Sequence, residues 1–389
     1  MSVIFAEAFL TAQVRDPVAA GRFYPADKEM LSEMVETFLD QAAPPAAERD
    51  VRLLWVPHAG YVFSGQIAAN GYRYLREKEY DLVVVIGTSH NIAVRGVSAG
   101  RFDSYATPLG EVGVDQHAVD TVIAASELVG FSGEAHRYEH SIEVQLPFIQ
   151  TVLPGVPILP LLCGRMDEGE TGRLAKELAS LFSDKKVLFV ISSDMSHYPS
   201  YEDAIRGDRA MLGAIRDLDF NRMSYVRTRF LKDNIPGLSC LLCNWQGVRL
   251  GMRLSVLTGA DNVELLPYAN SGDSDRGDRQ KVVGYGAACF YSNELEENGE
   301  KAMDEIDFSA EEKKLLFTIA RESIRSGLND EKRPDFSIEE GHLTLKRGVF
   351  VTLTNRGELR GCIGNFTGSY PLWEMVARMA ESAALRDYR

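Results

Sequence analysis

Short apolar runs alternate along the chain with stretches of amphipathic, helix-like spacing. The apolar runs, each bounded by polar or turn residues, predict buried strands. These runs are Val51–Val56, Leu82–Ile86, Val156–Leu162, Val187–Ile191 and Val282–Phe290. The amphipathic stretches predict helices and include Asp27–Gln41, Thr171–Phe182 and Glu202–Asp217. Strands that alternate with helices are typical of an α/β fold, in which helices cover a mixed or parallel sheet.

A change of composition divides the chain. Residues 293–307 hold seven acidic side chains and one lysine, with few apolar ones, and predict a solvated linker. Beyond this segment the periodic pattern restarts, and its expected elements are a helix at Ala310–Gly327, strands at Gly348–Thr354 and Leu359–Ile363, and a helix at Pro371–Leu385. The sequence therefore predicts a first domain over residues 1–292 and a smaller α+β domain over residues 308–389.

Charge and composition exclude several classes of partner. The formal net charge of −14 argues against nucleic acid, because phosphate backbones require a basic protein face. No apolar run approaches the length that spans a bilayer, so no membrane segment is expected. The amino terminus lacks the basic region of a signal peptide, and five cysteines are too few for a disulfide framework in 389 residues. These features predict a cytoplasmic protein.

Three of the seven histidines follow predicted strands directly. His58, His90 and His197 each lie in a polar loop after an apolar run, and Asp194 shares the loop of His197. The carboxyl ends of parallel strands meet at one edge of a sheet, where ligands collect. One such histidine alone is commonly a hydrogen-bonded structural residue, and Asp194 alone could cap a helix. Three together predict a polar pocket, and neutral imidazole is the commonest transition-metal ligand.

A fourth histidine, His140, lies in a segment that also carries Glu139 and Glu143. On a helix, His140 and Glu143 would be neighbours on one face. That spacing suits a ligand pair or an acid/base histidine beside a carboxylate, and it equally suits acids at a helix amino terminus. We expect His140 to be a pocket residue rather than a ligand.

Cys240 and Cys243 form a single CxxC pair. One pair is at most half of a zinc site, and the apolar residues between the cysteines also suit core packing. Cys240 follows a turn that opens a predicted helix, where the helix dipole favours a thiolate. One cysteine could therefore join the histidines as a ligand. The sequence has neither a glycine-rich phosphate loop nor a GxSxG elbow, which disfavours nucleotide binding and serine hydrolysis.

Several motifs in the first domain resemble the Memo family. In chain order they are VAAGRFYPAD, VPHAGYVFSG, GTSHN, YATPLGEVGVD, EHSIEVQLPF, SSDMSHY and VVGYGAACF. The resemblance covers residues 14–291 and implies a fold like that of the class III non-haem iron extradiol dioxygenases. It implies that His58 and His90 are metal ligands and that Asp194 and His197 are the other pocket residues.

The resemblance also implies a cysteine as the third ligand. This chain reads Cys-Leu-Leu-Cys-Asn where family members usually read Cys-Gly. Cys240 is the better match to the family position, and Cys243 is its competitor. The expected metal is iron(II), with copper as the alternative.

The second segment resembles the start of an AMMECR-type domain, on the stretch GVFVTLTNRGELRGCIGNF. At residue 389 about half of that family's usual length has been reached, so we expect an incomplete domain with uncovered apolar strand faces. Memo-type and AMMECR-type domains occur together with a radical-SAM protein in the AmmeMemoRadiSam system. The pairing implies that a radical-SAM protein is a partner.

Two functions follow as hypotheses. In the first, the chain is a metal-dependent, dioxygenase-like oxidoreductase in which His197 acts as an acid/base and Asp194 orients it, with His140 as a third catalytic candidate. Its ligand would be a small molecule or a peptide. In the second, the pocket holds a metal or a peptide without catalysis, and the chain is a binding or scaffold module. Fold analogy alone does not choose between them.

Overall fold

The structure is a computed structural model, and it forms two compact units, Met1–Leu295 and Glu296–Arg389. The residues that the structure describes are 13–45, 47–292, 308–329, 331, 334, 336, 338, 341–355, 358–365 and 370–385. The predicted linker at residues 293–307 lies outside them. Each unit is described separately.

The main sheet of the first unit contains eight strands within the described residues, in the spatial order β10-β13-β2-β9-β3-β8-β4-β7. The strands are β2 (Asp50–Val56), β3 (Leu82–Thr88), β4 (Val97–Ala99), β7 (Val129–Gly130), β8 (Ile158–Cys163), β9 (Val187–Ser192), β10 (Asn262–Leu265) and β13 (Ala288–Ser292). The central strands β2, β9, β3 and β8 are parallel, whereas β13 and β4 run antiparallel to their central neighbours. The prediction of a mixed sheet in an α/β fold is confirmed.

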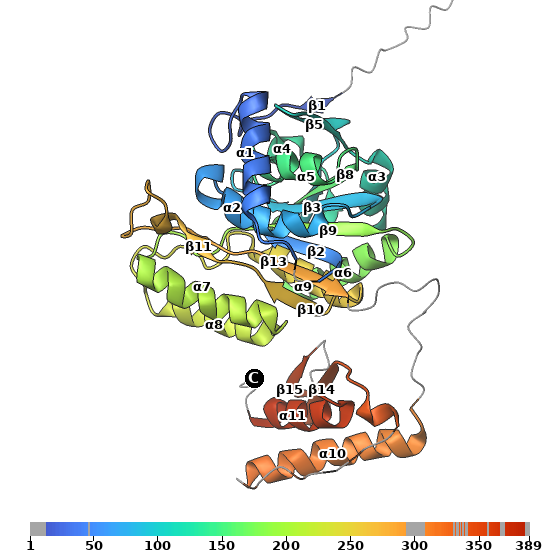
Figure 1. Cartoon of the computed structure of the whole chain (residues 1–389). Coiled ribbons are helices and arrows are strands. Elements are labelled where there is room, and N and C mark those ends of the chain that lie inside the picture. The colour runs from blue at the N-terminus through green and yellow to red at the C-terminus, as the bar shows by residue number, and fades with distance from the viewer. Residues whose placement is uncertain are drawn as a thin grey trace, which may run out of the picture. The chain divides into compact units, whose positions relative to one another are not determined.

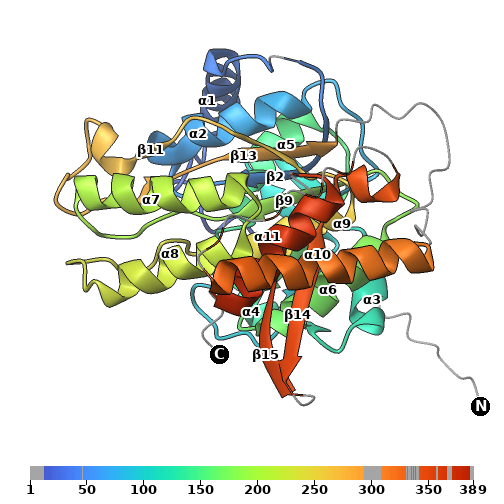
Figure 2. The ribbon, with the colours of Figure 1, turned by 90° about the horizontal axis from the view of Figure 1, so that it is seen from below.

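Helices cover both faces of this sheet (Figure 1). The helices are α1 (Lys28–Gln41), α2 (Tyr61–Tyr72), α3 (Gln116–Ala125), α4 (Gly133–Arg137), α5 (Leu146–Val152), α6 (Glu168–Leu181), α7 (Tyr201–Arg216), α8 (Phe220–Lys232) and α9 (Trp245–Leu257). Short 3₁₀ turns lie at η1 (Arg73–Leu75), η2 (Glu143–Gln145) and η3 (Ser271–Asp273). Helices α7 and α8 lie side by side, as Figures 1 and 2 both show.

Two glycines show how closely the helices approach opposite faces of the sheet. A Cβ atom at Gly71 of α2 would lie 2.7 Å from the side chain of Leu54. A Cβ atom at Gly251 of α9 would lie 3.1 Å from the side chain of Leu53 and 2.6 Å from that of Ile191. Successive residues of a strand point to opposite faces. Helices α2 and α9 therefore pack against opposite faces of β2. This packing fixes the orientation of the strand, and so the place where its carboxyl end reaches the edge of the sheet.

The predicted strand over Val282–Phe290 is wrong as a single element. The chain forms β12 (Gly284–Tyr285), which pairs with β11 (Ala269–Asn270), and then β13 in the main sheet. Gly286 lies between them, where a Cβ atom would be 2.8 Å from the sulfur of Met195. The backbone leaves one sheet for the other at this close approach, and a continuous apolar run does not reveal the change. A further small sheet contains β1 (Val14–Arg15), β5 (Ser104–Thr107) and β6 (Gly110–Gly113).

The second unit contains the elements that the sequence predicts. They are α10 (Ala310–Leu328), η4 (His342–Thr344), β14 (Val349–Asn355), β15 (Glu358–Asn365) and α11 (Leu372–Leu385). Ser309 caps α10 in a capping box with Glu312. Strands β14 and β15 pair antiparallel, and Ile319 of α10 is buried beside Val376 of α11. Within the described parts of both units, no helix is long and apolar enough to cross a membrane.

Candidate metal centre

Three neighbouring parallel strands deliver the predicted pocket residues to one edge of the sheet. His58 follows β2, His90 follows β3, and Asp194 and His197 follow β9, which lies between the other two strands. The rings of His58 and His90 meet edge to face, with centroids 5.2 Å apart. The structure therefore brings together four residues that are separated by up to about 140 positions in the sequence.

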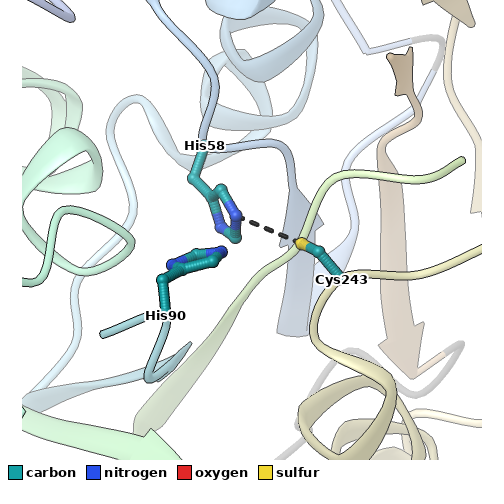
Figure 3. Close-up of side chains that lie close together, drawn as sticks. All are labelled: His58, His90 and Cys243. Atoms are coloured by element: carbon teal, nitrogen blue, oxygen red, sulfur yellow. Dashed lines mark hydrogen bonds between the residues drawn. The ribbon is translucent and has the colours of Figure 1, made fainter. Parts of the chain in front are cut away.

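Cys243 completes a group of three candidate metal donors with His58 and His90 (Figure 3). One ligand atom from each of the three lies within 4.8 Å of the others. The Nε2 atom of His58 is 3.1 Å from the Sγ atom of Cys243. His58 is 1% exposed, whereas His90 is partly exposed, so the group opens toward solvent on the His90 side.

The position of the sulfur differs from the prediction that favoured Cys240. Cys240 belongs to neither group of candidate ligands found among the described residues, and its carbonyl instead accepts a hydrogen bond from the His197 backbone at 3.0 Å. The predicted helix begins later than expected, at Trp245, with Asn244 as its cap. The Asn244 amide donates to the carbonyls of Ile86 and Ser192, which ties this cap to the ends of β3 and β9. Cys243 is the residue that this anchor places beside the histidines.

Glu139 holds the ring of His90, a role that the sequence pattern does not predict. Its carboxylate is buried and lies 2.9 Å from His90 Nδ1, and it also accepts the backbone N–H of His90 at 2.7 Å. Burial by itself would raise the pKa of Glu139, but the hydrogen bond and charge of His90, with the charge of His140, lower it to about 2. An ionised carboxylate only accepts, so Nδ1 of His90 carries a proton, and in the neutral ring Nε2 keeps its lone pair for a metal. The only sequence feature that points to Glu139 is its position directly before His140.

Asp194 lies between His58 and His197 and contacts both loops of the pocket. One of its oxygens accepts the backbone N–H groups of His58 and Ala59, at 2.7 and 3.2 Å. Its other oxygen lies 4.0 Å from His58 Nε2 and 3.9 Å from His197 Nε2. Burial raises the pKa of Asp194, against the opposing charge of His197. Asp194 does not cap the next helix, because Ser200 is the cap of α7.

His140 lies in the pocket as a stacked ring rather than as a partner of Glu143. Its ring stacks on His90, with centroids 4.6 Å apart, and the tilted ring of Phe23 contacts it with centroids 4.4 Å apart. Glu143 faces away, because its carboxylate bonds Arg15, Tyr24 and the backbone of Ala19. Burial, with the charge of His58, lowers the pKa of His140 to about 3, so the ring is neutral at physiological pH.

A second group of candidate ligands contains His90, Glu139 and His140. Its carboxylate already accepts hydrogen bonds from the His90 ring and from three backbone N–H groups, those of His90, His140 and Ser141. A metal at this point would have to displace these donors. The group is therefore better described as the support of His90 than as an ion site.

The donor set with Cys243 fits a transition metal. Imidazole nitrogen and thiolate sulfur suit iron, copper or zinc, whereas magnesium and calcium prefer oxygen. Burial raises the pKa of the Cys243 thiol well above its usual range, and a bound cation would remove that proton outright. The backbone N–H of Asp194 donates to the same sulfur at 3.1 Å. Nε2 of His197 is buried without a hydrogen-bond partner in the described residues, so this atom is available to bond a ligand in the pocket.

Buried neutral histidines make the stability of the metal-free protein depend on pH. Burial, with the charge of His90, lowers the pKa of His58 to about 3, and burial lowers that of His136 to about 4. The unfolded chain binds these protons below about pH 6.5, whereas the folded state binds them only below pH 4. The contribution of these two neutral rings to stability therefore falls as pH falls through this window, by roughly 1 kcal/mol per pH unit for each histidine. We expect a lower urea midpoint at pH 5 than at pH 7 in the presence of a chelator.

His136 provides a control for this prediction because it lies outside the donor set. Its Nδ1 atom bonds Tyr105 and its Nε2 atom lies 3.0 Å from the Ser98 carbonyl. His136→Gln should reduce the slope of stability against pH while keeping the same direction. An unchanged slope in His136→Gln would contradict the assignment of a neutral, buried His136 ring.

Comparisons with known proteins agree with the motifs and the fold. The family model described as Memo-like protein matches residues 15–289, and the AMMECR1 model matches residues 317–389. A MEMO1 family protein of Saccharolobus solfataricus is 33% identical over 299 residues, covering 72% of this chain and 99% of that protein. One from Archaeoglobus fulgidus is 35% identical over 282 residues, covering 71% and 99%.

Among solved structures, an uncharacterized protein of Escherichia coli K12 covers 61% of this chain and 99% of its own, with a TM-score of 0.41 and 11% identity. That likeness is too distant to carry an argument. The family match extends over most of the first unit and includes every residue of the donor set. This chain belongs to the Memo family.

Proposed function

We propose that this protein is a metal-dependent oxidoreductase that binds one redox-active transition metal, iron(II) as the expected ion, through His58, His90 and Cys243. The observation that carries the proposal is the convergence of two imidazole nitrogens and one thiol sulfur within 4.8 Å of one another. The carboxylate–histidine support of His90 strengthens it, because such partners orient and polarise metal ligands.

The remaining pocket residues are suited to move protons and to orient a substrate. His197 Nε2 and the outer oxygen of Asp194 are 3.9 Å apart, so one substrate or water oxygen could hydrogen-bond to both. Neutral His140 presents a donor or an acceptor from the opposite wall. A bound metal would supply Lewis-acid and one-electron chemistry toward oxygen. Asp194 and His197 would then hold and transfer the proton that such a reaction releases or consumes.

Metal content and oxygen uptake test this proposal. The full chain is purified without oxygen, loaded with iron(II), and assayed for bound metal and for oxygen consumption with catechols. We expect about one iron per chain. We also expect His197→Ala to keep the metal while slowing oxygen consumption roughly 10²–10⁴-fold, the usual range for a lost general acid/base. Failure of the unsubstituted chain to bind iron or copper at this stoichiometry would refute the proposal.

The sulfur ligand favours one alternative function, the handling of copper(I) without catalysis. Thiolates select soft cations, whereas non-haem iron oxygenases commonly use two histidines and a carboxylate. In this alternative, copper(I) binds more tightly than iron(II), and no oxygen is consumed with any substrate tested. A radical-SAM partner, a peptide or small-molecule ligand and a cytoplasmic location stay predictions that rest on the family resemblance and composition.

A further inference from the structure

A buried hydrogen-bond network lies behind His58, on the side away from the sulfur. Ser192, the last residue of β9, is fully buried. Its hydroxyl oxygen lies 2.6 Å from the carbonyl of Ser141, 2.9 Å from Gln145 Nε2 and 3.0 Å from His58 Nδ1. Gln145 is 1% exposed, so bulk solvent does not reach this network.

The orientation of the Gln145 amide follows from its two other contacts. Its nitrogen lies 2.9 Å from the carbonyl of Pro57, which can only accept. Its oxygen lies 3.0 Å from the hydroxyl of Tyr72, which can donate to it. The amide nitrogen therefore faces Ser192, and it donates a hydrogen bond to the serine oxygen.

The direction of every bond to Ser192 is then determined. A hydroxyl has one proton and two lone pairs. The proton must go to the Ser141 carbonyl, which can only accept, and Gln145 occupies one lone pair. Only a lone pair remains for His58, so its Nδ1 atom must be the donor. In a neutral imidazole, the proton on Nδ1 leaves Nε2 with its lone pair.

We propose that Ser192 and Gln145 are positioning residues that lock His58 in the Nδ1–H tautomer, so that Nε2 faces Cys243 as a ready electron-pair donor. Among the described residues, no carboxylate bonds Nδ1 of His58 as Glu139 bonds that of His90, and a neutral serine–glutamine pair takes that role. The tautomer follows from the network alone, whereas its use in holding a metal rests on the proposed function.

The tautomer can be measured in the metal-free full chain by ¹⁵N NMR of the imidazole rings, with His58→Asn used to assign the resonance. We expect His58 to show a protonated Nδ1 and an unprotonated Nε2. In Ser192→Ala no hydroxyl accepts a hydrogen bond from Nδ1, so the ring proton can move to Nε2 and both tautomers should be populated. Ser192→Thr keeps the hydroxyl and should restore the single tautomer. Ser255→Ala serves as a matched control, because Ser255 is equally buried but bonds its own helix.

Metal affinity supplies a second readout. With cobalt(II) as the probe, Ser192→Ala should weaken binding about 10–100-fold, the usual effect of losing an outer partner of a ligand histidine. An Nε2–H tautomer in the unsubstituted chain, or an unchanged tautomer in Ser192→Ala, would overturn the inference. If the tautomer responds as expected but no chain binds metal, the proposed function fails while the role of Ser192 in setting the tautomer stands.

Discussion

Replacing Cys243 with serine is expected to abolish stoichiometric metal binding, whereas replacing Cys240 with serine should leave it intact. The sulfur of Cys243 lies 3.1 Å from His58 Nε2, and Cys240 belongs to neither candidate ligand group in the described part of the chain. A serine hydroxyl is a hard and weakly acidic donor, so it does not replace a thiolate toward a soft cation. The loss should exceed the 10–100-fold that an outer partner contributes.

Cobalt(II) offers a direct measurement of this difference, because a cobalt–thiolate bond gives an ultraviolet charge-transfer band. The band should be present in the unsubstituted chain and in Cys240→Ser, and absent in Cys243→Ser. The two variants differ by one sulfur within the same four-residue segment, so each controls for the folding of the other. A band that survives in Cys243→Ser and disappears in Cys240→Ser would reverse the assignment.

The choice between these cysteines shows where the sequence stops being informative about the site. His58 and His90 can be placed from the sequence because each follows an apolar strand, and the carboxyl ends of parallel strands converge. Cys240 and Cys243 follow no strand. Cys243 is placed by its neighbour Asn244, whose amide reaches the carbonyls of Ile86 and Ser192 at 3.2 and 3.1 Å. Such a tertiary contact leaves no periodic signal in the chain.

The fold was more accessible than the site for the same reason. The strands β2, β3, β8 and β9 are each six or seven residues long, mostly buried and predominantly apolar, with Arg52 of β2 as an interruption. The pairing between them, and the division of Val282–Phe290 into β12 and β13, depend on contacts between distant residues. Glu139 illustrates the limit at single-residue scale. The sequence predicts a pocket role for the neighbouring His140, but the role of Glu139 depends on its contact with His90, which lies on a different loop.

A buried ion pair accounts for the second large expected effect. Arg15 and Glu143 form an ion pair in which both side chains are almost fully buried, at 2% and 0% exposure. The Glu143 carboxylate also accepts from the Tyr24 hydroxyl at 2.5 Å and from the Ala19 backbone at 2.7 Å. This carboxylate therefore ties the segment from residue 15 to residue 24 to the loop that carries Glu139 and His140.

Glu143→Gln should destabilise the first unit by about 3–5 kcal/mol, because it leaves the buried guanidinium of Arg15 without its anion. Arg101→Ala is the matched control, since Arg101 pairs with Asp120 with both side chains more than half exposed, and we expect a loss of at most about 1 kcal/mol. Urea unfolding followed by tryptophan fluorescence measures both. Trp373 is replaced by phenylalanine in every variant, so that Trp55 and Trp245 report on the first unit.

The Arg15–Glu143 ion pair also predicts how the substitutions Glu143→Gln and Arg15→Met combine. Arg15→Met removes the charge that Glu143→Gln leaves buried without an anion. The double variant should therefore lose less stability than the sum of the two single losses. The other partners of Arg15 are the carbonyls of Asp16, His136 and Glu139, none of which can neutralise its charge. A loss below about 1 kcal/mol in Glu143→Gln would mean that solvent reaches Arg15. A full loss in the single variant, with partial recovery in the double, would show that the buried charge of Arg15, left without its anion, is what destabilises the first unit.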